Sequence, residues 1–113
     1  MVFVSDIERS IAFYQLLGFA VENTFTREGH QTPTWASLQS DEAELMLARA
    51  SDPINDKEQG ILFYVYCADV TAARADLLKN NIPCSEITFP FYAPRGEFRV
   101  EDPDGYVFMI THT

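Results

Sequence analysis

The sequence predicts an α+β domain built from two copies of one βαβββ unit, and three observations support this prediction. The chain has 113 residues, a length that suits one domain. When it is shifted against itself by 63 positions, the apolar and turn positions of the two halves coincide. Each half starts with a β-branched or aromatic run, continues with helical spacing and ends in strand-like segments. We therefore expect a single domain at 1–113, with repeat one at 1–52, a linker at 53–60 and repeat two at 61–113.

The repeat is clearest in the first and last segments of the two halves. The shift places Val2–Ile7 over Val65–Val70, and Leu45–Leu47 over Phe108–Ile110, without a gap. Few residues are identical, but the apolar character and the turn positions agree throughout. One offset that serves a strand, a helix and a hairpin together is hard to obtain by chance, so a duplicated unit is the best interpretation.

Each half contains one expected helix, whose limits are visible in the sequence. Asp6 and Asp69 follow the first strand of each half, where a carboxylate can accept hydrogen bonds from the amides of the first helical turn. Gly18 and Asn81 stand where a left-handed C-terminal cap is expected. The apolar positions at helical spacing are Ile7, Ile11 and Tyr14 in the first helix and Val70, Ala73 and Leu77 in the second.

Four strands are expected in each half, from runs rich in β-branched and aromatic residues. The last two strands of each half meet at a tight turn, Gln39–Glu42 or Asp102–Gly105, and the polar segment Ser51–Gly60 joins the halves. The expected strands are Val2–Val4, Ala20–Thr26, Thr34–Leu38, Ala43–Ala50, Ile61–Cys67, Ser85–Phe89, Glu97–Glu101 and Tyr106–Thr111.

The charge and the cysteines narrow the class of protein. The net charge of −9, from 8 basic and 17 acidic residues, would repel nucleic-acid phosphates, favours solubility and would attract a cationic ligand.

No apolar run approaches the ~20 residues that cross a bilayer, and no signal-peptide pattern precedes the first strand, so we expect a soluble, cytoplasmic protein. Cys67 and Cys84 have no metal or redox spacing, and no disulfide is expected.

Three segments resemble the vicinal oxygen chelate superfamily, which includes glyoxalase I, extradiol dioxygenases, fosfomycin-resistance enzymes and bleomycin-binding proteins. These segments are Val4–Tyr14, Leu17–Phe19 and Glu101–Tyr106, and the likeness spans nearly the whole chain. The resemblance implies two βαβββ repeats whose curved mixed sheets surround a cavity, with the helices on the outer face. It says less about chemistry, because one fold hosts many functions.

The resemblance also implies where a metal would bind, and these positions argue against one. The two carboxylate positions of the superfamily fall on Met46 and Met109. The first-strand position of the second repeat falls on Leu62, or on Ile61 if the strand slips by one residue, and its counterpart in the first repeat would precede Met1. Thioether and aliphatic side chains do not suit Ni, Zn, Fe or Mn. We expect no metal and no other cofactor, and we expect His30 and His112 to be solvated surface residues.

Strand alternation, combined with the superfamily's inward-facing positions, predicts the lining of a ligand pocket. Trp35, which the repeat aligns with Phe98, is instead expected in the core. A mostly apolar, aromatic-rich wall with a few polar groups is typical of a small-molecule site, but the same side chains could fill a collapsed core. Likewise, Arg99 could form a structural ion pair or bind an anion. The expected lining is Phe3, Met46, Leu62, Tyr64, Tyr66, Arg99, Glu101 and Met109.

Three functions fit these expectations. The first is a metal-independent binding protein that resembles the bleomycin-resistance type and sequesters an aromatic or cationic small molecule in a pocket shared by a homodimer. The second is an enzyme that resembles glyoxalase-like lyases, isomerases or dioxygenases, with a noncanonical metal site or metal-free acid–base catalysis by Glu97, Glu101 or Tyr64. The third is a structural or regulatory dimer without a ligand.

Overall fold

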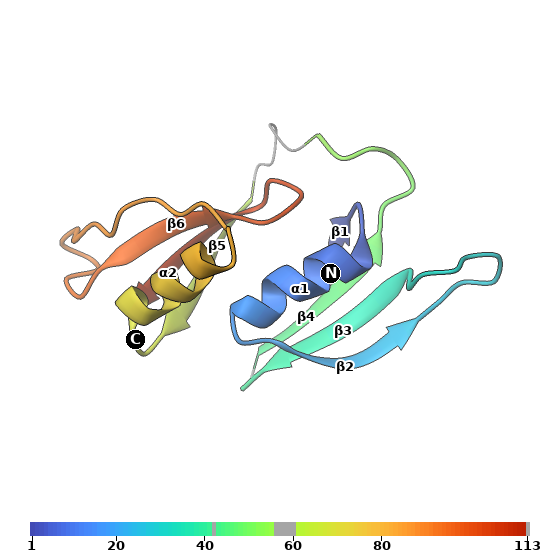
Figure 1. Ribbon diagram of the computed structural model, residues 1–113, viewed down its shortest axis with the longest axis horizontal. Helices are drawn as coiled ribbons and strands as arrows, with labels where there is room; N and C mark the ends of the chain where they lie inside the picture. Colours follow the sequence, from blue (N-terminus) through green and yellow to red (C-terminus); the bar gives the residue numbers. More distant parts are fainter. Residues whose placement is uncertain (42, 56–60, 113) are drawn as a thin grey trace. The chain divides into compact units, whose positions relative to one another are not determined.

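A computed structural model describes residues 1–41, 43–55 and 61–112 of the chain. Contacts within the chain divide it into two compact units, Met1–Asn55 (unit one) and Asp56–Thr113 (unit two). The boundary falls inside the expected linker at 53–60; residues 56–60 of that linker, and Glu42 of the expected first hairpin turn, lie outside the described residues. Each unit contains one sheet and one helix (Figure 1). That the two units form a single domain stays a prediction.

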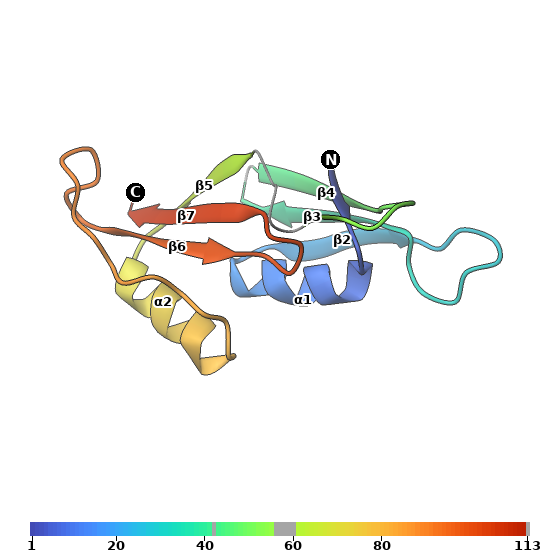
Figure 2. The ribbon, with the colours of Figure 1, turned by 90° about the horizontal axis from the view of Figure 1, so that it is seen from above.

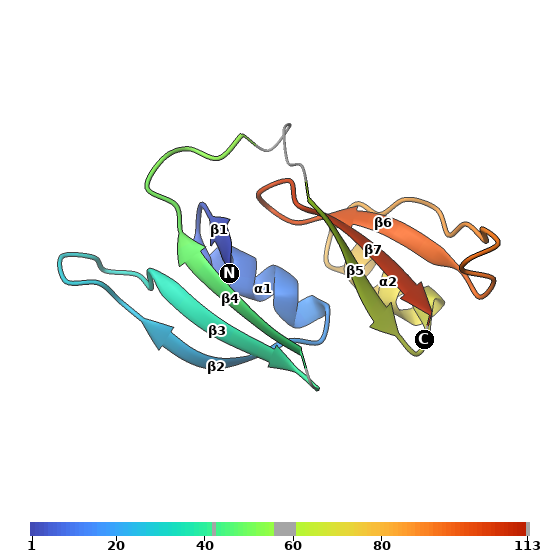
Figure 3. The ribbon, with the colours of Figure 1, turned by 180° about the vertical axis from the view of Figure 1, so that it is seen from behind.

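Unit one is a four-stranded mixed sheet with a helix against one face. Its strands follow the order β1-β4-β3-β2, in which β1 pairs with β4 in parallel and the other pairs are antiparallel. Helix α1 contacts β2, β3 and β4, and the core lies between them. Figure 3 shows β3 and β4 in front of α1, from the side of the sheet that its helix leaves uncovered. The elements are β1 (Val2–Val4), α1 (Ile7–Leu16), β2 (Ala20–Phe25), β3 (Trp35–Ser40) and β4 (Ala43–Arg49).

Unit two repeats this arrangement with three strands in the order β5-β7-β6. Strand β5 pairs with β7 in parallel, and β6 pairs with β7 antiparallel. Helix α2 contacts β6 and β7 and lies on one side of them (Figure 2). The elements are β5 (Leu62–Cys67), α2 (Val70–Lys79), β6 (Glu97–Glu101) and β7 (Val107–His112).

Both helices begin and end as predicted. The side chain of Asp6 accepts a hydrogen bond from the amide of Arg9 at 3.2 Å, and Asp69 accepts one from Ala72 at 3.1 Å. Beyond the helix ends, Gly18 has a φ angle of 97° and Asn81 one of 63°, the left-handed conformation of a C-terminal cap. Local sequence was therefore sufficient to place both helices.

The 63-residue repeat appears directly in the pairing of the parallel strands. Val2 pairs with Leu47 in unit one, and the residues 63 positions later, Val65 and Ile110, pair in unit two. The predicted fold class is confirmed: the chain is α+β, with two βαβββ-like units that form mixed sheets.

The predicted strand at Ser85–Phe89 is wrong, and one side chain explains why. The segment makes only two isolated bridges to β6, Cys84 with Val100 and Thr88 with Glu97. Between them, the amide of Arg99 donates to the Oγ of Ser85 at 2.7 Å instead of to a backbone carbonyl. A serine hydroxyl that accepts a hydrogen bond from a backbone amide competes with the backbone hydrogen bonds that would otherwise join the two strands.

Trp35 is not a core residue, contrary to the prediction from its alignment with Phe98. It pairs with Ala48, whereas Phe98 pairs with Ile110, so β6 is displaced by one residue from the position that a shift of 63 requires. A slip of one residue turns every side chain of a strand to the other face. Ala36 and Leu38 therefore point into the core of unit one, while Trp35 faces away from α1.

The second hairpin turn follows expectation. Oδ1 of Asp102 accepts hydrogen bonds from the amides of Asp104 and Tyr106, and Gly105 has a φ of 83°. Cys67 and Cys84 are free, and burial is the main cause that raises the pKa of both thiols. Neither α1 nor α2 is long and apolar enough to cross a membrane, and the described residues contain no other helix.

Candidate functional site

The open face of each sheet, defined as the face opposite its helix, carries the candidate site. In unit one, a row of paired residues crosses all four strands in the order Phe3, Ala48, Trp35 and Phe25. Directly paired side chains of neighbouring strands lie next to each other on one face. Because alanine is small, the row has a gap between two aromatic side chains.

A pocket of about 580 Å³ lies on this row. Its size falls in the ordinary range for small-molecule sites, roughly 300 to 1,000 Å³. Among the described residues, all those that line it belong to unit one. Its lining is Met1, Phe3, Phe25, Arg27, His30, Thr34, Trp35, Ala48, Arg49, Ala50 and Ser51.

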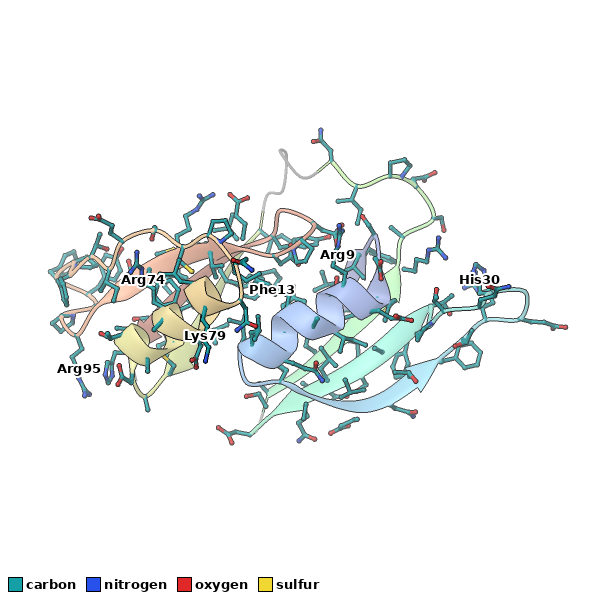
Figure 4. The ribbon with its side chains drawn as sticks, viewed as in Figure 1. Arg9, Phe13, His30, Arg74, Lys79 and Arg95 are labelled. Atoms are coloured by element: carbon teal, nitrogen blue, oxygen red, sulfur yellow. The ribbon has the colours of Figure 1, made fainter. Side chains whose placement is uncertain are left out.

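Backbone hydrogen bonds bring three basic side chains to the rim of this pocket. The amide of His30 donates to the carbonyl of Arg27 at 3.0 Å, and Gly29, with a φ of 89°, closes the turn between them. Thr34 connects this turn to β4. Its Oγ1 accepts a hydrogen bond from the amide of Arg27, and its carbonyl accepts one from the amide of Arg49. Nη1 of Arg49 then lies 3.4 Å from Nδ1 of His30. Figure 4 shows His30 on the segment between β2 and β3.

The predicted site residues fall on two separate faces. Phe3 lies in the pocket of unit one, and Met46 lies on the same open face outside that lining. The other six lie on the open face of unit two, where paired residues form three rows across β5, β7 and β6. These rows are Leu62–Val107–Glu101, Tyr64–Met109–Arg99 and Tyr66–Thr111–Glu97.

The polar groups of the unit two face are partly paired with one another. Nη2 of Arg99 lies 2.9 Å from Oε1 of Glu101, so Arg99 forms an ion pair, one of the two roles expected for it. Both residues also line a surface pocket of about 440 Å³ beside Cys84 and Ser85. Glu97 is different, because it is only 2% exposed and Tyr92 donates to its Oε1 at 2.9 Å. Its Oε2 is buried without a hydrogen-bond partner among the described residues.

The three residues at the metal-ligand positions that the resemblance implies are not of metal-binding types. Met46 and Met109 occupy equivalent positions on β4 and β7, and Leu62 lies on β5. In the part of the chain that the structure describes, no three His, Cys, Asp or Glu side chains form a group that could hold a metal ion. Two thioethers and an aliphatic side chain do not fit a divalent transition metal, which requires imidazole and carboxylate ligands.

Comparison with known proteins identifies the family. A model of the Glyoxalase/Bleomycin resistance protein/Dioxygenase superfamily matches residues 1–110 of the chain. The chain belongs to this superfamily. No curated protein sequence matches the chain, so the assignment to the superfamily rests on the family match.

Solved structures of superfamily members share this fold at low sequence identity. A bleomycin-binding protein in complex with bleomycin has a TM-score of 0.74 at 16% identity, over 99% of this chain and 93% of that one. An antibiotic-binding protein from a Streptomyces species has a TM-score of 0.68 at 19% identity, over 98% and 91% of the two chains. A fosfomycin resistance protein from Mesorhizobium loti has a TM-score of 0.76 at 10% identity, over 97% and 85%.

Most of the unit one pocket was missed by sequence reasoning. Only Phe3 was expected in it, Trp35 was assigned to the core, and His30 to the solvated surface. His30 is exposed, but it also lines the pocket beside Arg49. The face of Trp35 was inferred from its alignment with Phe98. If β3 had been paired with β4 directly, Trp35 would have been placed opposite Ala48 on the open face.

Proposed function

We propose that the protein binds an aromatic small molecule in the unit one pocket, as a metal-independent member of the superfamily that resembles the bleomycin-resistance type. The observation that carries this proposal is the row Phe3–Ala48–Trp35–Phe25 beneath a pocket of about 580 Å³. Flat side chains on both sides of a small residue offer an aromatic ring a slot with apolar walls. The fold it shares with bleomycin-binding and antibiotic-binding proteins supports the same class of function.

Metal independence is part of the proposal and has its own test. It rests on the poor fit of Met46, Met109 and Leu62 to the metals of the superfamily. We expect elemental analysis of the purified protein to find well below one Ni, Zn, Fe or Mn per chain. A stoichiometric metal that is lost on chelation together with ligand binding would contradict this part of the proposal.

The binding proposal is tested by filling the gap in the aromatic row. A panel of aromatic compounds is screened for thermal stabilisation, and the affinity of each hit is measured by calorimetry for the wild type and for Ala48→Leu. We expect the larger side chain to weaken binding at least about tenfold, because it occupies the space between Phe3 and Trp35.

Ala72→Leu is the matched control, because Ala72 is an exposed alanine on α2 of unit two. It should leave every affinity unchanged. Hits whose affinity is the same in the wild type and in Ala48→Leu would mean that the unit one pocket is not the binding site.

Homodimer formation is a second part of the proposal. The open faces carry six large apolar side chains that are between 38% and 65% exposed, an unusual amount of apolar surface to leave in water. A second copy of the chain is the partner we propose to cover these faces, with the small molecule held between the unit one pocket and that copy. The six side chains are Phe3, Phe25, Met46, Leu62, Tyr64 and Tyr66.

A metal-free acid–base enzyme is the alternative function, and Glu97 is the observation that favours it. A buried carboxylate oxygen without a partner is costly unless a ligand supplies a donor, and catalytic bases are often held in such surroundings. Product analysis after incubation with each binding hit separates the two functions. Turnover that is lost in Glu97→Gln while binding is kept would favour the enzyme.

A further inference from the structure

We propose that the unit one pocket selects aromatic ligands that carry an acidic group, such as a carboxylate or a sulfonate. This inference rests on the proposed function and specifies the charge of its ligand. It runs against the net charge of −9, which by itself would favour a cationic ligand. Charges farther away than about 10 Å are largely screened at physiological salt, so the groups at the rim decide which ligand binds.

The side chains that line the pocket are basic or uncharged. Two of the chain's 8 Lys and Arg residues, Arg27 and Arg49, line it together with His30, and no Asp or Glu of the described residues does. Neither guanidinium forms an ion pair with a carboxylate among the described residues. Arg49 also borders a smaller cavity, of about 150 Å³, that Asp6 and Glu8 line. Those two carboxylates would therefore compete with a bound anion for the guanidinium of Arg49.

The basic groups stand at the edge of the sheet where β2 and β4 end. Arg27 follows Phe25, the last residue of β2, by two residues. Arg49 is the last residue of β4; strand alternation starts its side chain on the helix side of the sheet, but it lines the pocket, and its Nη1 lies 3.4 Å from Nδ1 of His30. The hydrogen bonds of Thr34 hold the backbones of Arg27 and Arg49 toward each other. A ring placed over Ala48 with its substituent toward this edge would approach Arg27 and Arg49, and guanidinium groups bind planar oxyanions with paired hydrogen bonds.

Trp35 provides a site-specific signal, because it is the only tryptophan of the chain and lies in the pocket. Nitroaromatic rings quench tryptophan fluorescence on contact. The test therefore measures how far three probes quench the Trp35 fluorescence of the full-length protein. The probes share a nitrophenyl ring and differ in charge: 4-nitrobenzoate, 4-nitrobenzyl alcohol and 4-nitrobenzylammonium. Free N-acetyltryptophanamide corrects for absorption and for collisional quenching. We expect saturable quenching, with 4-nitrobenzoate bound at least about tenfold more tightly than the cation.

Variants then assign the preference to the two arginines. Arg27→Gln and Arg49→Gln should each weaken 4-nitrobenzoate binding by about fivefold and weaken binding of the neutral alcohol by clearly less. Arg95→Gln is the control, because it removes the same charge from unit two; Figure 4 shows Arg95 just before β6. Higher salt should weaken binding of the anion alone.

The outcomes separate this inference from the function on which it rests. Saturable quenching by all three probes with equal affinity, or with the cation bound best, would overturn the acidic-ligand inference and leave aromatic binding intact. The same holds if 4-nitrobenzoate binds best but both arginine variants keep its affinity. No saturable quenching by any probe would overturn the inference and count against the unit one pocket as an aromatic site.

Discussion

The hydroxyl of Tyr92 donates a hydrogen bond to Oε1 of Glu97 at 2.9 Å, although the two residues differ greatly in exposure. Glu97 is 2% exposed at the start of β6, while Tyr92 is 60% exposed in the segment that leads to this strand. This hydrogen bond, followed by desolvation of the hydroxyl and then by the proximity of the Glu97 charge, raises the pKa of Tyr92. The exposed tyrosine thus covers and partly satisfies a buried carboxylate.

The raised pKa of Tyr92 predicts how stability changes at alkaline pH. Because the folded-state pKa lies above the ordinary value of 10.0, the stabilisation is fully present below pH 10 and is lost as the pH rises through the folded-state pKa. We expect Tyr92→Phe to lower the melting temperature at pH 8, and this difference from the wild type to shrink above pH 10. Repeating the comparison in Glu97→Gln tests the cause, since the pH effect should be smaller there. A constant difference across this range in both backgrounds would contradict the prediction.

Met109→Glu tests whether the open face of unit two is solvated. Met109 is half-buried and pairs with Tyr64 and Arg99, so a carboxylate there can remain hydrated beside a guanidinium. We expect a loss of no more than about 1–2 kcal/mol in the free energy of unfolding, measured by denaturant titration. Ile110→Glu is the control on the same strand, because Ile110 is buried on the helix side and should lose several kcal/mol or fail to fold. A Met109→Glu variant as damaged as Ile110→Glu would assign Met109 to a collapsed core.

Gly96 should tolerate no side chain. It has a φ of 107°, and an added Cβ would lie 2.9 Å from Cγ2 of Ile87 and 3.2 Å from Phe89. We expect Gly96→Ala to cost at least about 2 kcal/mol, because backbone strain and overlap add. Gly29, with a φ of 89° and no atom within 4 Å of an added Cβ, isolates the strain, so Gly29→Ala should cost only about 1 kcal/mol. Equal losses in denaturant melts would show that the overlap at Gly96 is relieved.

The proposed homodimer predicts a concentration-dependent mass. We expect sedimentation equilibrium at micromolar concentrations to give twice the chain mass of 12.8 kDa. Leu62→Glu and Tyr66→Glu, on the open face of unit two, should each raise the dimer dissociation constant at least about tenfold. Leu78→Glu changes an exposed apolar side chain on α2, outside the open faces, and should have no effect. A monomer mass for the wild type would contradict the proposal.

The helices and the repeat could be predicted because their signals are local and recur in both halves. Asp6 and Asp69 cap the helices through the first-turn amides, a contact that spans three residues. The repeat makes the pairing of Val2 with Leu47 equivalent to that of Val65 with Ile110, but the structure was needed to show that these strands pair. The sequence alone thus determined the fold class, both helices, and the strands to which Leu62, Tyr64, Tyr66 and Met109 belong.

Only the tertiary structure decided which face Trp35 occupies, whether Ser85 joins a sheet, and which charges gather at the pocket. The face of Trp35 depends on a one-residue difference between two hairpins, and strand periodicity converts that difference into a reversal of sides. The Oγ of Ser85 accepts a hydrogen bond from the backbone amide of Arg99, fourteen residues later in β6. Arg27 and Arg49 are 22 positions apart, and the amides of both donate hydrogen bonds to Thr34. Each of these results depends on contacts between distant segments, and a pattern of residue types along the chain does not contain that information.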